Sequence, residues 1–191
     1  GQPMTQDTDI YVGYTDTALI IGVIAYDSEP QAIISTDTRR DSSLDDTDSI
    51  KVLIDGLQDR QNGFIFGTNP SGVEYDGQVT REGAGQGFPG SPGGFNLNWD
   101  APWTVHSAVF DGGWSTEMRI PFTTLRYGTE DVQSWGFNIE RRIRRNNEVA
   151  YWAPMSQDRD LLRVSEAGTL THVRPPKQRN LQVTPYVLAS R

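Results

Sequence analysis

Cysteine is absent from the sequence, which excludes disulfides, thiol nucleophiles and zinc sites built from cysteine. Positive charge is scarce: 17 lysines and arginines stand against 25 aspartates and glutamates, so the formal net charge is −8. That sign disfavours binding to nucleic acid or to an anionic membrane surface. Long hydrophobic runs are also missing, since the longest, Ala18 to Tyr26, is far shorter than the roughly 20 residues of a membrane-spanning helix. The 191 residues suffice for one domain with a sizeable core.

Apolar residues occur instead in short alternating runs between Gly, Pro, Asn and Asp, and no long stretch has the 3.6-residue periodicity of an amphipathic helix. This pattern predicts strands at 9–14, 18–26, 49–55, 63–69, 73–80, 103–110, 113–121, 135–143, 149–153 and 168–173. The turns at 15–17 and 111–113 predict antiparallel hairpins, and 121–125 predicts one helical turn. We therefore expect an all-β fold, specifically a two-sheet antiparallel β-sandwich of jelly-roll type.

Two segments interrupt the strand pattern. The segment 36–48 is acidic and includes Asp41, Asp45, Asp46 and Asp48, whose carboxylates repel one another unless a cation lies among them. Oxygen ligands of this kind favour Ca²⁺, although the spacing is not that of an EF-hand. The alternative is a solvated acidic turn in which Asp48 caps the following strand.

The second interruption, 82–102, is a glycine-rich segment that we expect to form a long loop. It carries Phe88, Phe95 and Trp99, with Trp103 just after its end. Aromatic residues are depleted in segments that stay disordered, so we expect these side chains to dock on the rest of the domain.

The predicted hairpin at 135–154 separates two kinds of side chain by strand alternation. Trp135, Phe137, Ile139 and Ile143 share one side, and Asn138, Glu140, Arg142 and Arg144 share the other. With a turn at Asn146 and Asn147, Trp152 is expected opposite Arg141. A partly exposed tryptophan beside arginine and glutamate suits a sugar, whose C–H face packs on the ring while the charged groups bind its hydroxyls. The alternative is a tryptophan at the rim of the core with surface ion pairs.

Signals for catalysis are weak. His106 and His172 are the only histidines, and no serine lies in a G-x-S-x-G setting. A glycoside hydrolase needs two facing carboxylates, but with 25 acidic residues such a pair can always be nominated.

Five stretches form a combined pattern that covers nearly the whole chain. They are 9–30 (DIYVGYTDTALIIGVIAYDSEP), 39–59 (RRDSSLDDTDSIKVLIDGLQD), 63–76 (GFIFGTNPSGVEYD), 113–127 (GWSTEMRIPFTTLRY) and 134–152 (SWGFNIERRIRRNNEVAYW). Together they resemble the family 9-like carbohydrate-binding module at the N-terminus of large bacterial outer-membrane proteins with a C-terminal predicted β-barrel. The resemblance implies a β-sandwich over 1–176, bound Ca²⁺ and binding of a poly- or oligosaccharide, and no catalytic residues in the module.

The resemblance also implies site residues. Trp152 is the sugar-binding tryptophan, with Asp48, Arg144 and Glu148 as looser polar partners. Where a second aromatic clamp is expected, the chain has arginines, so either Arg40 or an aromatic residue of the glycine-rich loop takes that place, or sugar binding has lapsed. Trp103, just after that loop, is a further candidate for the sugar. The remaining candidates are Asn69 for the sugar, and Asp41, Asp45, Asp46 and Asp76 for the metal. Residues 177–191 resemble a linker and the start of the barrel, which implies an outer-membrane location on either its periplasmic or its extracellular side.

Three hypotheses follow. The first is a non-catalytic carbohydrate-binding module of an exported or outer-membrane protein, stabilised by Ca²⁺ and linked to polysaccharide breakdown. The second is an interaction or plug domain that packs on its own barrel. The third is a glycoside hydrolase acting on O-glycosyl bonds.

Overall fold

The computed structural model describes residues 4–84, 94–156 and 158–177. These residues form an all-β fold with short 3₁₀ turns, as the alternating pattern predicts. The strands are β1 (Thr8–Tyr14), β2 (Ala18–Tyr26), β3 (Ser49–Asp55), β4 (Gly63–Thr68), β5 (Tyr75–Val79), β6 (Phe95–Asn96), β7 (Thr104–Phe110), β8 (Gly113–Pro121), β9 (Gln133–Ile143), β10 (Glu148–Tyr151) and β11 (Gly168–Val173). No helix among the described residues has the length and hydrophobicity needed to span a membrane.

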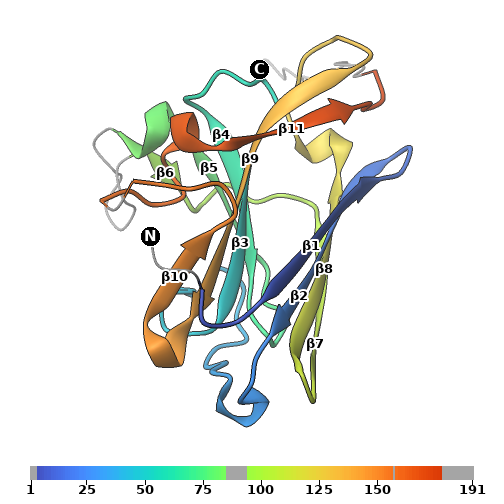
Figure 1. Cartoon of the computed structure of the whole chain (residues 1–191). Coiled ribbons are helices and arrows are strands. Elements are labelled where there is room, and N and C mark those ends of the chain that lie inside the picture. The colour runs from blue at the N-terminus through green and yellow to red at the C-terminus, as the bar shows by residue number, and fades with distance from the viewer. Residues whose placement is uncertain (1–3, 85–93, 157, 178–191) are drawn as a thin grey trace, which may run out of the picture.

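Within the described residues the strands form two antiparallel sheets that face each other, and Figure 1 shows them as two layers. The smaller sheet has the order β1-β2-β8-β7. The larger sheet has the order β10-β9-β3-β4-β5-β6, and β11 also pairs with β9. The expected two-sheet β-sandwich is therefore confirmed.

The main core lies between the sheets because alternate residues of each strand point inward. Strand β2 contributes Leu19, Ile21 and Val23, which pack toward Ile50 and Val52 of β3 on the opposite sheet. Trp114 and Trp135 belong to the same cluster and are almost fully buried. The expected helical turn is present as Phe122–Thr124, with Phe122 in the core.

A second, smaller cluster lies on the outer face of the larger sheet. It combines Leu53 and Ile65, which point away from the main core, with Phe95 from β6 and Leu161 and Val164 from the segment after β10. This segment covers only part of the outer face. The remainder is open, and the pocket described below lies there.

One local expectation is corrected. The glycine-rich segment is not a loop throughout, because Phe95 and Asn96 pair with Val79 and Gln78 of β5. Its aromatic side chains do dock where they are described: the Trp99 ring stacks on Phe64 with centroids 4.5 Å apart. Phe88 and residues 178–191, nearly all of the expected linker and start of the barrel, lie outside the described residues.

Candidate functional site

A row of five residues crosses the outer face of the larger sheet from β5 to β10. The registers place Tyr75 beside Gly67, Gly67 beside Lys51, Lys51 beside Glu140, and Glu140 beside Tyr151. Neighbouring strands lie about 4.8 Å apart, so the backbones of the two tyrosines are roughly 19 Å from each other. The row thus presents a cation and an anion between two aromatic residues.

Gly67 leaves a gap in the middle of this row that its neighbours enter. A Cβ atom at Gly67 would lie 2.7 Å from Leu44 Cδ1, 3.1 Å from Tyr75 Cδ1 and 3.2 Å from Lys51 Cγ. The absence of a side chain at this position therefore allows Tyr75 and Lys51 to approach each other, and the Lys51 Nζ atom lies 6.0 Å from the Tyr75 ring centroid.

A cavity of about 380 Å³ opens over this row, and we call it the cross-sheet pocket. Its lining combines ionic, aromatic and aliphatic side chains: Asp45, Lys51, Ile65, Tyr75, Phe95, Glu140, Arg142, Val149, Tyr151, Asp160, Leu161 and Leu162. The volume falls within the range typical of small-molecule sites.

The ionic groups of the cross-sheet pocket are close to one another but incompletely bonded. Lys51 Nζ lies 3.3 Å from both Glu140 Oε1 and Asp45 Oδ1, and Arg142 Nη2 lies 3.5 Å from the same Asp45 oxygen. Glu140 is only 4% exposed, yet its Oε1 atom makes no hydrogen bond of good geometry, and the buried Arg142 Nε atom has no partner. Buried polar atoms without a hydrogen bond are rare in folded proteins, so the ionic groups of this pocket are not fully satisfied by the protein itself.

The two tyrosines keep their protons at neutral pH. Burial and the nearby Asp45 and Glu140 carboxylates raise the pKa of Tyr75 well above its usual range. Burial and Glu140 do the same to the pKa of Tyr151. Both phenols therefore act as hydroxyl groups, and the pocket offers N–H and O–H donors, carboxylate acceptors and apolar ring surface side by side.

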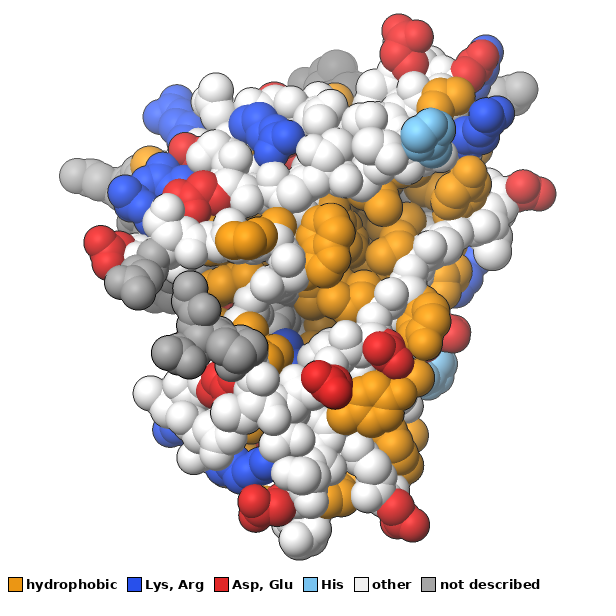
Figure 2. All heavy atoms as spheres, in the orientation of Figure 1, with side chains coloured by type: hydrophobic (Ala, Val, Ile, Leu, Met, Phe, Trp, Pro, Cys, Tyr) orange, Lys and Arg blue, Asp and Glu red, His pale blue; other side chains and the backbone are white. Residues whose placement is uncertain are grey.

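Trp152 lies at a different opening, on the side of the hairpin that faces the gap between the sheets. It is 51% exposed, and its ring meets Phe137 edge-on at a centroid distance of 5.8 Å. The indole rests directly on Gly168, where an added Cβ would lie 2.5 Å from the ring. A groove of about 430 Å³ adjoins it, and Figure 2 shows the hydrophobic hollow between β1 and the larger sheet. The predicted exposure of Trp152 is thus confirmed, and its role in sugar binding stays a prediction.

The predicted register of the hairpin is corrected by two residues. Ala150, not Trp152, lies opposite Arg141, and the Trp152 N–H donates to the carbonyl of Ile139 at 2.9 Å. The difference arises because the turn includes all of Arg144 to Asn147, with Asn147 in the left-handed region at φ 49°. A shift of two residues leaves each side chain on the same face of the sheet, so Trp152 and Arg141 still share one side.

Three of the predicted sugar-binding residues are structural. Trp103 is 4% exposed and donates from Nε1 to Asp76 at 3.0 Å. The buried Asp48 carboxylate accepts from the N–H groups of Ile34 and Arg144 at 2.6 and 2.7 Å. The fully buried Asn69 amide donates to the carbonyl of Asp37 and accepts from the Ser71 N–H. These side chains are buried and bonded internally, and their assignment to a sugar site stays a prediction.

The other polar candidates are engaged at the surface. Glu148 accepts from the N–H and the hydroxyl of Thr5 at 2.8 and 2.6 Å. Burial acts to raise the pKa of Glu148, but these bonds from Thr5 lower it below its ordinary value. Arg144 Nη2 lies 3.4 Å from Asp46 Oδ1. Neither residue lines either of the two openings described above.

The four aspartates expected to bind Ca²⁺ do not meet at one point. Asp45 faces Lys51 and Arg142, Asp46 faces Arg144, and Asp41 and Asp76 both face Arg40. In the described part of the chain, no three acidic or histidine side chains are arranged to hold a metal ion. The predicted ligand set therefore does not fit a single ion, and binding of Ca²⁺ elsewhere stays a prediction.

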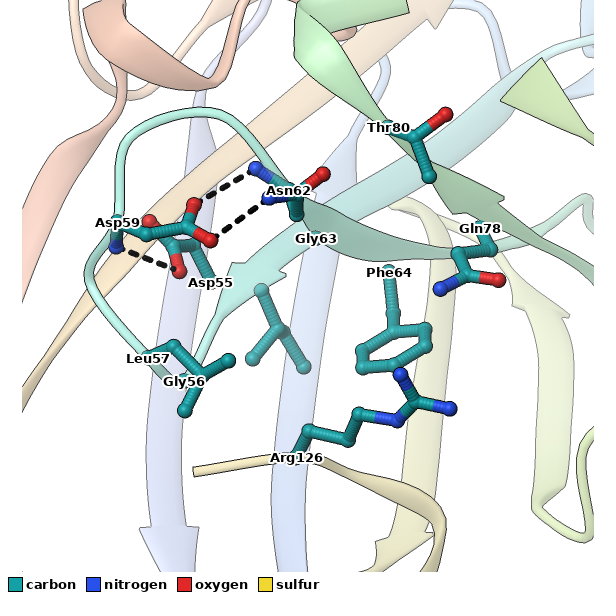
Figure 3. Close-up of a pocket in the computed structure, with 11 residues that line it drawn as sticks. Asp55, Gly56, Leu57, Asp59, Asn62, Gly63, Phe64, Gln78, Thr80 and Arg126 are labelled. Carbon is teal, nitrogen blue, oxygen red and sulfur yellow. Dashed lines mark hydrogen bonds between the residues drawn. The ribbon is translucent and has the colours of Figure 1, made fainter. Parts of the chain in front are cut away.

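A third cavity, of about 300 Å³, lies at the end of the sandwich beside the turn between β3 and β4. Figure 3 shows the Arg126 guanidinium near the Phe64 ring and the carboxylate of Asp59 bonded to Asn62. Burial raises the pKa of Asp55, whose carboxylate accepts from the N–H groups of this turn. The Asp55 and Asp59 carboxylates of this cavity thus stabilise the turn itself, whereas the carboxylates of the cross-sheet pocket contact side chains of other strands.

The sequence reasoning identified the charged face of the hairpin but not the whole site. Glu140 and Arg142 were placed together on that face, whereas Lys51, Tyr75 and Tyr151 were not considered as binding residues. A usable signal was present at Lys51, which is the only lysine or arginine within the strand Ser49–Asp55 and interrupts its apolar residues.

Comparisons with known proteins place the fold. A solved structure from Bacteroides uniformis, described as that of a candidate carbohydrate-binding protein, superposes with a TM-score of 0.64 at 12% identity, over 88% of this chain and 79% of that one. A carbohydrate-binding module of family 9 from Caldicellulosiruptor kristjanssonii, solved in complex with cellotriose, gives a TM-score of 0.58 at 12% identity, over 97% of this chain and 83% of that one. No model of a known protein family and no curated protein sequence matches the chain.

Proposed function

We propose that this chain is a saccharide-binding domain and that the cross-sheet pocket is where the saccharide binds. The observation that carries the proposal is the row from Tyr75 to Tyr151, in which the buried Glu140, whose Oε1 atom pairs with Lys51 but makes no hydrogen bond of good geometry, lies between two protonated tyrosines. Sugars present hydroxyls that donate and accept along with apolar C–H faces, and this lining offers a counterpart to each.

The charge of the pocket favours an uncharged ligand. Lys51 and Arg142 contribute two positive charges, and Asp45, Glu140 and Asp160 contribute three negative ones. The lysine and the arginine already face carboxylates of the protein, so no free cation is left for an acidic sugar among the lining residues. The fold shared with the cellotriose-bound module supports a neutral oligosaccharide and supplies a first probe.

A glycan array that includes cello-oligosaccharides tests the proposal, followed by calorimetric titration with the best ligand. Replacement of the buried carboxylate by an amide, Glu140→Gln, changes shape little and removes the strongest acceptor of the pocket. We expect this change to weaken binding at least tenfold, or about 1.4 kcal/mol. Circular dichroism and the melting temperature establish that the variant is folded.

Trp152→Ala is the matched comparison, because Trp152 lies only one residue after Tyr151 but opens onto the groove between the sheets. We expect Trp152→Ala to retain binding. Loss of binding in Trp152→Ala with full binding in Glu140→Gln would move the site to the groove and return to the assignment made from the sequence.

The cellular setting is part of the same proposal and rests on the sequence resemblance. We propose that the domain belongs to an exported or outer-membrane protein involved in polysaccharide binding. Measurable affinity for an isolated barrel from the parent protein, with a blank glycan array, would favour the docking hypothesis. Release of reducing sugar from a bound oligosaccharide would favour the hydrolase.

A further inference from the structure

Arg40 is surrounded by four carboxylates from three parts of the chain. Its Nη1 atom lies 2.5 Å from Glu74, its Nη2 atom lies 2.6 Å from Asp76 and also contacts Asp100, and its Nε atom lies 3.6 Å from Asp41. These partners come from the acidic segment, from the start of β5 and from the segment before β7. One guanidinium therefore ties three segments together.

Among the four carboxylates around Arg40, that of Asp76 depends most on a nearby positive charge. Its side chain is fully buried, and burial raises its pKa above the ordinary value although it accepts from Trp103 Nε1, the Ala101 N–H and Arg40. A buried carboxylate without a compensating charge is strongly destabilising. Arg40 is the cation that lies within ion-pair distance of Asp76 among the described residues.

We propose that the Arg40 guanidinium compensates the negative charge of this acidic cluster in place of a divalent metal ion. Carboxylate oxygens are the donors that Ca²⁺ selects, but these four are spread around the guanidinium and do not converge on one point. Two of them, Asp41 and Asp76, are among the aspartates expected from the sequence to bind the ion. Of the other two expected ligands, Asp45 pairs with Lys51 and Arg142, and Asp46 pairs with Arg144. The cluster thus holds a covalently attached cation that chelators cannot remove. This inference does not depend on the proposed saccharide site.

The proposal makes a direct prediction for the unmodified protein. Addition of 5 mM EDTA or, separately, of about 1 mM Ca²⁺ is expected to shift the melting temperature by less than about 1 °C, because no metal stabilises this cluster. Tb³⁺ serves as a luminescent probe for Ca²⁺ sites, and Trp103, which is hydrogen-bonded to Asp76, is placed to sensitise it. We expect no sensitised Tb³⁺ emission from the unmodified protein at micromolar Tb³⁺.

Arg40→Met removes the cation and leaves the four carboxylates. The melting temperature is expected to fall by about 10 °C without metal, and about 1 mM Ca²⁺ is expected to restore at least half of the loss. Because the carboxylates approach different nitrogens of Arg40, they must move inward to bind a spherical ion. Glu74 and Asp100 are partly and largely exposed, so they are free to do so. Sensitised Tb³⁺ emission should appear in this variant.

Arg39→Met is the matched control. Arg39 is the preceding residue and pairs with Asp37 at the surface, with 83% of its side chain exposed. This variant should melt like the unmodified protein and give no Tb³⁺ emission. The proposal is overturned if the unmodified protein loses stability in EDTA or sensitises Tb³⁺. It is equally overturned if Arg40→Met is destabilised, or unfolded, and Ca²⁺ restores nothing.

Discussion

At the scale of single residues, the stability of Asp76 depends on three donors of different kinds. The Trp103 indole, the Ala101 backbone and the Arg40 guanidinium each supply one bond to a carboxylate that has no access to water. Buried acceptors that lose a donor retain the cost of their desolvation, so each of these donors matters more than a surface hydrogen bond does. Trp103 therefore acts as a hydrogen-bond donor within the core.

Trp103→Phe tests this role because phenylalanine keeps an aromatic ring but has no N–H. We expect the free energy of unfolding to fall by about 2 kcal/mol, measured by urea denaturation. Trp99→Phe is the control, since Trp99 contributes ring stacking on Phe64 and is half-buried. A loss for Trp103→Phe no larger than that for Trp99→Phe would contradict the importance of the Asp76 bond.

At the scale of elements, one ion pair fastens the two sheets together. Asp27 follows β2 of the smaller sheet, and Arg145 lies in the turn between β9 and β10 of the larger sheet. Their bidentate contact measures 2.5 and 2.7 Å, with only 3% of the Asp27 side chain exposed. Burial acts to raise the pKa of Asp27, but hydrogen bonds from Arg145 and from the Glu29 N–H lower it below the ordinary 3.8.

Asp27→Asn is expected to reduce the free energy of unfolding by about 3 kcal/mol near neutral pH. Because the pKa is lowered in the folded state, the stabilisation is present above pH 3.8 and is lost as the pH falls through the lowered value. The difference in melting temperature between the variant and the unmodified protein should therefore be constant at neutral pH and shrink in acid. A difference that persists unchanged to about pH 2 would show that the charge of Asp27 is not the cause.

The elements also show which features are predictable from a sequence. The strands Ala18–Tyr26, Ser49–Asp55, Gly113–Pro121 and Gly168–Val173 were predicted with their observed bounds because alternation of apolar residues is a local signal. Strand β6 has only two residues and was missed. The register at Trp152 was wrong because the left-handed conformation of Asn147 lengthens a turn that composition alone does not specify.

At the scale of the whole molecule, the cross-sheet pocket exists only because of the strand order. Lys51 and Tyr75 lie in the consecutive strands β3 to β5, and Glu140 and Tyr151 lie in the hairpin of β9 and β10. These two segments are far apart in the sequence and become neighbours because β3 pairs with β9. Arg40 and its partners Glu74 and Asp100 likewise come from separate segments of the chain and meet only in the folded structure. The sandwich and the charged face of one hairpin could therefore be predicted from the sequence. Sites whose side chains come from separate segments could be identified only in the structure.

The most direct test of the account is a nuclear magnetic resonance titration of the isotope-labelled domain with the saccharide that binds best on the array. We predict that the largest chemical-shift changes occur at the backbone amides of Lys51, Glu140 and Tyr151. The indole N–H of Trp152 and the amides of β1 should change little. Changes concentrated at Trp152 and β1, with none at Lys51 and Glu140, would contradict the assignment of the cross-sheet pocket as the binding site.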